Sequence, residues 1–255
     1  MLKVAVLASG RGSNFQAIIE HERSGIFKDI KIEVLIYNHV KANVAKIAQK
    51  YGVPAIFLEY KRKKRMVFED EILGTLNSFN IQLACLAGWD QIVGAKLFEA
   101  YRGRLMNVHP ALLPSFGGKG LDGRFVHRAV LEYGVKVTGV TVFYVDVSVE
   151  RGPIIVQKPV EVREEELNLF SSSVPEEQEK AVEILSDRVL VHEHRLYSKA
   201  IQLHADGRVK IKEKRATIDY SGGWEKEWRE RERGFIDFQK EYWVERIHAL
   251  REVSK

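Results

Sequence analysis

An open α/β fold built on a doubly wound, mostly parallel sheet is predicted by two observations. Short apolar runs recur along the first half of the chain, and segments whose apolar residues have helical spacing separate them. Strands that are covered on both faces read as continuous apolar runs, and strands that alternate with helices form parallel sheets with right-handed crossovers. The predicted strands cover residues 4–7, 32–36, 55–58, 83–87 and 105–108.

The remaining elements follow from the same patterns. Apolar spacing predicts helices around residues 15–19 and 67–76. Residues 137–162 are rich in β-branched residues around a turn at 150–153, which predicts antiparallel strands added to the sheet. A long helix is expected over residues 175–204, where Val182, Leu185, Val189 and Ile201 recur at helical spacing. A turn at 205–208 then leads into a short strand at 209–211.

The last part of the chain differs in composition. Trp224, Trp228 and Trp243 lie there among dense charged residues, after a glycine-containing hinge at 221–223. We expect a main domain over residues 1–215 and a C-terminal helical extension over 216–255. The aromatic side chains of the extension, which include Phe235, Phe238 and Tyr242, are expected on one side of a helix. That side either packs on its own domain or forms a lid or a homodimer contact.

Composition limits the classes of function. The chain has 255 residues and a formal net charge of +5, and charges of both signs alternate along it, which does not favour a nucleic-acid partner. A basic balance does attract small phosphorylated or carboxylated molecules. The one cysteine, Cys85, lies within an apolar run, and no apolar stretch is long enough to cross a bilayer. We therefore expect a cytoplasmic protein with small-molecule ligands and without a membrane partner.

The segment from Asn107 to Pro114 carries the strongest functional signal. Residues i and i+2 of a strand point to the same side, so Asn107 and His109 converge on one small volume. Pro110 and Pro114 end the strand in a rigid turn, and open α/β sheets bind their ligands beyond such strand ends. An amide that donates to an oxyanion beside an imidazole that moves a proton suits addition of a nucleophile to a carbonyl carbon. The alternative is a strand end with two satisfied polar groups.

A glycine-containing loop, residues 9–14, joins the first strand to the first helix. Its glycines let backbone N–H groups close on an anion at the helix N-terminus. The dinucleotide fingerprint is incomplete, because Phe15 occupies the third glycine position and no acidic residue follows the second strand at Tyr37-Asn38. The loop therefore fits a single terminal phosphate, although Ser13 or Asn14 could serve only as a helix cap. We predict no metal site, because His192 and His194 face different sides of a helix.

Several motifs in this order resemble those of the folate-dependent glycinamide ribonucleotide formyltransferases. They are residues 9–14, 86–89, 107–114, 139–142 and 192–194, together with Gly152-Pro153, and the resemblance covers about residues 1–215. It implies the Rossmann-like formyltransferase fold. It also implies transfer of a formyl group from 10-formyltetrahydrofolate, the formyl-donor cosubstrate, to the amine of 5-phosphoribosyl glycinamide in purine biosynthesis.

The resemblance also implies roles for individual residues. Gly12, Ser13 and Asn14 would hold the nucleotide phosphate, and Glu193 would receive hydroxyls of the ribose or the glycinamide portion. Asn107 and His109 would act on the formyl group. The cofactor-binding residues would be Arg65, Asp90, Gln91, Ile92, Val93, Asn107 and Asp146. Arg65 lies in the basic run 61–65, so a solvated basic face is the alternative for it.

The chemistry needs a carboxylate to hold the imidazolium of His109, and here the chain departs from the family. Glu150 stands where the family has an aspartate. Glutamate keeps the charge but adds a methylene, and a misplacement of about 1 Å can cost on the order of 10²-fold in rate. Three outcomes follow: Glu150 serves, Asp146 takes over, or catalysis is weakened or altered. Phe143, Gln91 and the glycine-rich segment 117–123 are further departures.

The sequence is also compatible with two other functions. A 10-formyltetrahydrofolate hydrolase would let water replace the amine on the same scaffold. A noncatalytic nucleotide- or folate-binding paralogue is prompted by Glu150 and by the altered loop.

Overall fold

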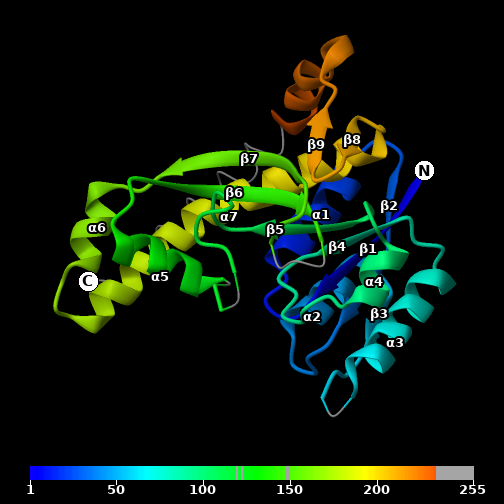
Figure 1. Ribbon diagram of the computed structural model, residues 1–255, viewed down its shortest axis with the longest axis horizontal. Coiled ribbons are helices and arrows are strands. Elements are labelled where there is room, and N and C mark those ends of the chain that lie inside the picture. The colour runs from blue at the N-terminus through cyan, green and yellow to red at the C-terminus, as the bar shows by residue number, and fades with distance from the viewer. Residues whose placement is uncertain (62, 119, 122, 147–149, 234–255) are drawn as a thin grey trace.

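The computed structural model describes residues 1–61, 63–118, 120, 121, 123–146 and 150–233 (Figure 1). Its centre is a seven-stranded sheet in the order β3-β2-β1-β4-β5-β6-β7. Strands β1 to β5 pair in parallel, whereas β6 is antiparallel to β5 and β7 is antiparallel to β6. The predicted fold class, including the antiparallel additions, is confirmed.

The parallel strands alternate with helices along the chain. The strands are β1 (Leu2–Ala8), β2 (Ile30–Tyr37), β3 (Ala55–Phe57), β4 (Leu83–Leu86) and β5 (Leu105–His109), and the helices between them are α1 (Ser13–Arg23), α2 (Asn43–Tyr51), α3 (Arg65–Ser78) and α4 (Ala95–Ala100). Both faces of the sheet are covered, because β1 and β4 contribute side chains to two separate apolar cores. The strand predicted at 55–58 is the exception. It is a short edge strand, and its side chains remain largely exposed.

The second half of the chain completes the sheet and covers it. Its elements are α5 (Arg124–Tyr133), β6 (Val137–Tyr144), β7 (Ile154–Glu161), α6 (Glu164–Phe170) and α7 (Pro175–Ala205). The long helix α7 packs on α1, β6, β7, α5 and α6, and its buried face extends from Ala181 to Leu203. The predicted helix at 175–204 is thereby confirmed, and α7 ties the two halves of the molecule together (Figure 1).

A small hairpin and the start of a further helix follow α7. Strands β8 (Val209–Lys212) and β9 (Arg215–Ile218) pair antiparallel, and the single-turn helix η1 (Ser221–Gly223) precedes a helix described from residue 224 to 233. The strand β9 was not predicted, and it begins at the expected domain boundary. Trp224 and Trp228 are buried and stacked, with ring centroids 5.8 Å apart. Phe235, Phe238, Tyr242 and Trp243 lie outside the described residues.

Two glycines fix the backbone turns that the site needs. Gly12, before α1, has a φ of 83°, and a Cβ there would lie 2.8 Å from the side chain of Val44. At Gly152 a Cβ would lie 1.7 Å from the carbonyl oxygen of Tyr144. Neither position has room for a side chain, so the predicted phosphate loop (residues 9–14) and the Gly152-Pro153 turn both depend on glycine. Among the helices that the structure describes, none is both long and apolar enough to cross a membrane.

Candidate active site

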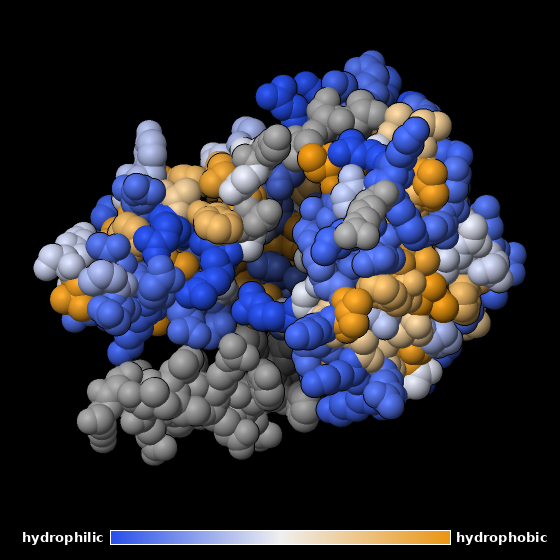
Figure 2. Space-filling model, turned by 90° about the horizontal axis from the view of Figure 1, so that it is seen from below, coloured by the Kyte–Doolittle hydropathy of each residue, from blue (hydrophilic) through white to orange (hydrophobic). Residues whose placement is uncertain are grey.

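The candidate site lies at the carboxyl ends of β1, β4 and β5. The chain proceeds from β1 toward β2 and β3 on one side and resumes with β4 on the other, so a topological switch point lies between β1 and β4. A cavity of about 380 Å³ opens there. Its lining includes residues 10–14, 87–89 and 107–110, with Gly123, His127, Glu150, Ser186, Leu190 and Glu193. Figure 2 shows a hydrophilic hollow between the part built from α5 to α7 and the part built from α1 to α4.

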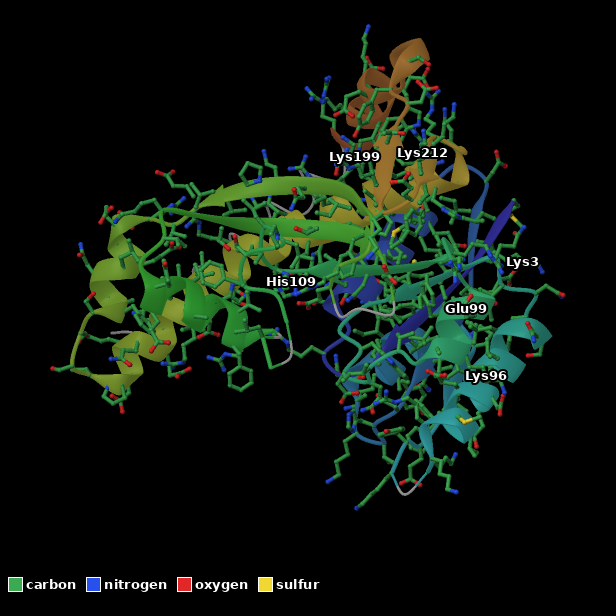
Figure 3. The ribbon with its side chains drawn as sticks, in the orientation of Figure 1. Lys3, Lys96, Glu99, His109, Lys199 and Lys212 are labelled. Atoms are coloured by element: carbon green, nitrogen blue, oxygen red, sulfur yellow. The ribbon has the colours of Figure 1, made fainter. Side chains whose placement is uncertain are left out.

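Strand β5 positions the amide and the imidazole as the sequence predicted. Asn107 pairs with Phe143 and His109 pairs with Thr141 across β5 and β6, and both Asn107 and His109 line the cavity. The His109 side chain is only 3% exposed. Figure 3 shows it at the end of β5 in the interior of the molecule, whereas the labelled lysines lie at the periphery.

Glu150 is the carboxylate that contacts the histidine. Its Oε1 lies 2.8 Å from Nδ1 of His109, and its Oε2 accepts a hydrogen bond from the backbone N–H of Gly118. The backbone of Glu150 has a φ of 55°, an uncommon conformation for a residue with a side chain. Asp146 instead lines the neighbouring cavity described below. The longer glutamate side chain thus reaches His109 from a left-handed turn.

The second ring nitrogen of His109 is also engaged. Nε2 lies 2.8 Å from the carbonyl oxygen of Phe116. A carbonyl oxygen only accepts hydrogen bonds, and so does an ionised carboxylate, so the two contacts together suit the doubly protonated ring. While Nε2 donates to the Phe116 carbonyl, its N–H is not available to another acceptor. Proton transfer to a bound molecule therefore requires exchange of this hydrogen bond.

The phosphate loop forms one wall of the cavity. Ser13 is the first residue of α1, so the free N–H groups of the first helical turn border the cavity at this loop. The side chain of Asn14 donates from Nδ2 to Oε2 of Glu193 at 2.9 Å, and both side chains are buried. Burial raises the pKa of Glu193, although the hydrogen bond from Asn14 opposes this shift. The structure therefore brings Gly12, Ser13, Asn14 and Glu193 together.

A second cavity of about 340 Å³ contains most of the residues predicted for folate. It is lined by Asp90, Gln91, Ile92, Val93, Phe143 and Asp146, together with Trp89, Asn107 and Glu150. Trp89, Asn107 and Glu150 line both cavities, so the two meet beside His109. Arg65 is not among the residues lining either cavity. It begins α3, and its Cδ is 3.0 Å from the position of a Cβ on Gly94.

The side chain of Asp90 has a structural role that the sequence did not reveal. Its carboxylate accepts hydrogen bonds from the side chains of Ser9, Asn38 and His39. Partial burial tends to raise the pKa of Asp90, but the hydrogen bonds from His39, Asn38, Gln91 and Ser9 outweigh it and lower the pKa to about 2. The carboxylate thus ties the predicted folate segment to the ends of β1 and β2.

Three residues of the first cavity were missed by the sequence reasoning. Ser186 lies seven positions before Glu193 on α7, a spacing that places both on one helix face and could have identified it. Arg11 lies within the phosphate loop but was treated only as part of a motif. His127 belongs to α5 and has no motif around it, so no signal in the sequence identifies it.

The fold and the site together have the form of an α/β enzyme that acts on a carbonyl group, with the glycine-containing loop 9–14 bordering the cavity. The family model for formyl transferases matches residues 2–201. The chain therefore belongs to the formyl transferase family, which confirms the resemblance seen in its motifs. In the described part of the chain, no group of three or more His, Cys, Asp or Glu residues could hold a metal ion.

Individual relatives agree with this assignment. The phosphoribosylglycinamide formyltransferase of Bacillus subtilis is 34% identical over 203 residues, which is 79% of this chain and 94% of that protein. The human trifunctional purine biosynthetic protein adenosine-3 is 36% identical over 214 residues, 83% of this chain, but this chain spans only 19% of that protein. The crystal structure of glycinamide ribonucleotide transformylase 1 from Symbiobacterium toebii has 35% identity and a TM-score of 0.75, and the match covers 86% of this chain and 94% of that one.

A formyltetrahydrofolate deformylase from Pseudomonas syringae shares the fold alone. It has 21% sequence identity and a TM-score of 0.68, and the match covers 85% of this chain and 65% of that one.

Proposed function

We propose that this protein transfers the formyl group of 10-formyltetrahydrofolate to the amine of 5-phosphoribosyl glycinamide, a reaction of purine biosynthesis. The observation that carries the proposal is the contact between His109 and Glu150, 2.8 Å long, beside Asn107 at the junction of two cavities. Relatives that bear the name of this activity support it, and one of them is nearly fully spanned by this chain.

The two cavities suit two ligands that must meet. The lining of the first cavity contains both the phosphate loop and His109, which fits a phosphorylated substrate whose amine reaches His109. Trp89, Ile92, Val93 and Phe143 give the second cavity apolar walls, and Asp146 adds a polar group to its lining. This combination fits a flat heteroaromatic ring with one polar edge. When bound, 10-formyltetrahydrofolate supplies the formyl group.

The residues of this chain then perform the proton transfers. The amine attacks the formyl carbon as the neutral base, and the formyl oxygen becomes negative. The Asn107 amide and the protonated ring of His109 donate hydrogen bonds to that oxygen. Glu150 holds the ring as the imidazolium, and His109 gives a proton to the folate nitrogen when its bond to carbon breaks. His109 recovers a proton from the attacking amine, so charge and protons balance.

The binding roles form part of the same proposal. The backbone of Gly12, Ser13 and Asn14 holds the phosphate, and Glu193 accepts hydroxyls of the ribose or N–H groups of the glycinamide portion. Residues 90–93 hold the pterin mainly through their backbone, because the carboxylate of Asp90 is already bonded to four neighbouring side chains. Asp146 adds a further folate contact, whereas Arg65 lines neither cavity, and its contact with the folate stays a prediction.

Formylation assays with His109→Ala test the proposal. The variant should bind both substrates but lose formyl transfer, because it lacks the group that stabilises the oxyanion and carries the proton. His204→Ala is the matched control, since this partly buried histidine of α7 hydrogen-bonds Tyr144 and lines neither cavity. Full activity of His109→Ala would overturn the mechanism.

The same assay separates the other functions. Formate release that does not require the glycinamide nucleotide would identify a hydrolase, and binding of both ligands without turnover would identify a noncatalytic paralogue. The division into a domain at 1–215 and an extension at 216–255, the homodimer and the cytoplasmic location stay predictions. Sedimentation of the full chain and of a form truncated after Arg215 would test the first two.

A further inference from the structure

A buried histidine on the wall of the first cavity has no role in the mechanism above. His127 lies in α5 (Arg124–Tyr133), which packs against α6 and α7. Its side chain is only 2% exposed, yet it lines the cavity that also contains the phosphate loop and His109. Among the residues that the structure describes, its Nδ1 has no hydrogen-bond partner.

An unpartnered ring nitrogen in such a position is informative, because buried polar groups in folded proteins nearly always have partners. His109 shows the normal pattern, because Glu150 and Phe116 engage its two ring nitrogens. Asn14 does so in part: its Nδ2 donates to Glu193, whereas its Oδ1, which can only accept, has no partner among the described residues. His127 is therefore the member of this lining that lacks a partner for a buried nitrogen, and its partner is expected to be the molecule that fills the cavity.

The charges around His127 indicate what kind of molecule this is. Burial and, to a lesser extent, the nearby positive charges of His109 and Arg11 together lower the pKa of His127 to about 4. The neutral ring has one N–H donor and one acceptor nitrogen. Arg11 lines the same cavity, its side chain is exposed, and its positive charge acts on both His127 and Glu193. A positive charge beside a buried ring nitrogen that can carry the N–H suits an anion.

We propose that His127 is a substrate-binding residue whose ring N–H donates to the phosphate group held by the backbone of residues 12–14, with Arg11 at the rim of the same group. This inference deepens the proposed function, on which it rests. It assigns to α5 the wall of the phosphate site that faces the helix N-terminus of α1. The phosphate then touches three elements, so its binding positions the amine relative to His109.

Substrates with and without the phosphate test the contact. His127→Leu removes the donor and keeps a buried side chain of similar bulk. With the phosphorylated glycinamide nucleotide, KM should rise about tenfold or more, as expected when a hydrogen bond to a charged group is lost. With the dephosphorylated riboside, kcat/KM should match that of the unaltered protein. If kcat/KM falls by the same factor for both substrates, His127 has only a structural role and the inference is refuted.

Two controls accompany this comparison. His204→Asn should leave the ratio of kcat/KM for the two substrates unchanged, because this histidine bonds to Tyr144 and lies outside the cavity lining. If His127→Leu does not fold by circular dichroism, His127→Gln replaces it. Glutamine retains an N–H group at a different position, so an intermediate rise in KM for the phosphorylated substrate alone is expected. An unchanged KM for the phosphorylated substrate, in whichever variant folds, would overturn the proposal.

A measurement without turnover separates this inference from the proposed function. Inorganic phosphate is titrated into the full chain by calorimetry, and the imidazole signals of His127 are followed by nuclear magnetic resonance. Binding should weaken about tenfold in His127→Leu, and phosphate should shift the His127 signals. If phosphate binding depends on His127 but the protein formylates nothing, the phosphate contact stands and the reaction assignment fails. If phosphate binds equally well to both proteins, the phosphate contact fails.

Discussion

Shortening Glu150 by one methylene should impair catalysis more than removing its charge. In the structure, Oε1 of Glu150 lies 2.8 Å from Nδ1 of His109. A carbon–carbon bond is about 1.5 Å long, so Glu150→Asp would leave a gap on the order of 4 Å unless the backbone moves. Such a gap exceeds the length of a hydrogen bond. Oε2 would also withdraw from the N–H of Gly118, to which the glutamate is bonded.

The two substitutions differ in the magnitude expected. Glu150→Gln keeps the length but removes the charge, and a hydrogen bond to a charged partner contributes about 1.5–3 kcal/mol, or roughly 10- to 150-fold in rate. Glu150→Asp loses the contact altogether and also misplaces the ring, which costs on the order of 10²-fold or more. We therefore expect kcat to be highest in the unaltered protein, lower in Glu150→Gln and lowest in Glu150→Asp.

Steady-state kcat at saturating concentrations of both substrates measures this order. Asp146→Asn serves as the comparison, because Asp146 lines the second cavity, proposed for the folate, and was the alternative partner of His109. It should raise KM for the folate more than it lowers kcat. An active Glu150→Asp variant would refute the reasoning, since an aspartate could then support His109 from this backbone. A collapse of kcat in Asp146→Asn, with Glu150→Gln unaffected, would transfer the role to Asp146.

Three further predictions concern stability. Gly152→Ala should cost about 3 kcal/mol or more in urea unfolding, because the added Cβ would lie 1.7 Å from the Tyr144 carbonyl oxygen, and a cost below 1 kcal/mol would contradict this. Trp228→Ala should lower the free energy of unfolding by about 3–5 kcal/mol, as its 1% exposure indicates, and an unchanged thermal midpoint would make the stacked pair a passive contact. Burial lowers the pKa of His21 to about 4 and of His194 to about 3, so the unfolded chain binds their protons first and stability should fall as pH drops from about 6.5 toward 4. A urea midpoint that is equal at pH 7 and pH 5 would contradict the last prediction.

The fold was predictable because its signals are local. Apolar runs separated by helical spacing identify the parallel strands, and the antiparallel β6 (Val137–Tyr144) and β7 (Ile154–Glu161) follow from their β-rich composition. The strand β9 (Arg215–Ile218) escaped because its alternation is short, and among the described strands it pairs with β8 alone. The exposure of β3 escaped because an edge position depends on strand order, which sequence alone does not fix.

In the candidate site, too, the residues related by a local pattern were predictable and those brought together by tertiary packing were not. Asn107 and His109 are related by strand periodicity, and the sequence therefore placed them together. His127 reaches the same cavity only because α5 packs on α7, a tertiary contact with no signature in the residues around it. The carboxylate of Asp90 was expected near the folate, yet side chains from the ends of β1 and β2 hold it, which again depends on strand order.

Glu150 and the glycine-rich segment 117–123, which the sequence analysis identified as departures from the family pattern, contribute to the candidate site rather than to the sheet. Glu150 follows a segment outside the described residues, and its side chain bonds to Gly118 in the loop after β5. The same loop places the Phe116 carbonyl next to Nε2 of His109. The carboxylate of Glu150, in the turn before β7, thus contacts both the loop after β5, at Gly118, and the imidazole of His109. The two ring nitrogens of His109 thus depend on two different loops, Nδ1 on Glu150 and Nε2 on the Phe116 carbonyl. Because the Glu150 carboxylate also holds the N–H of Gly118, Glu150→Asp should disturb both loops, which is a second reason to expect a lower kcat in that variant.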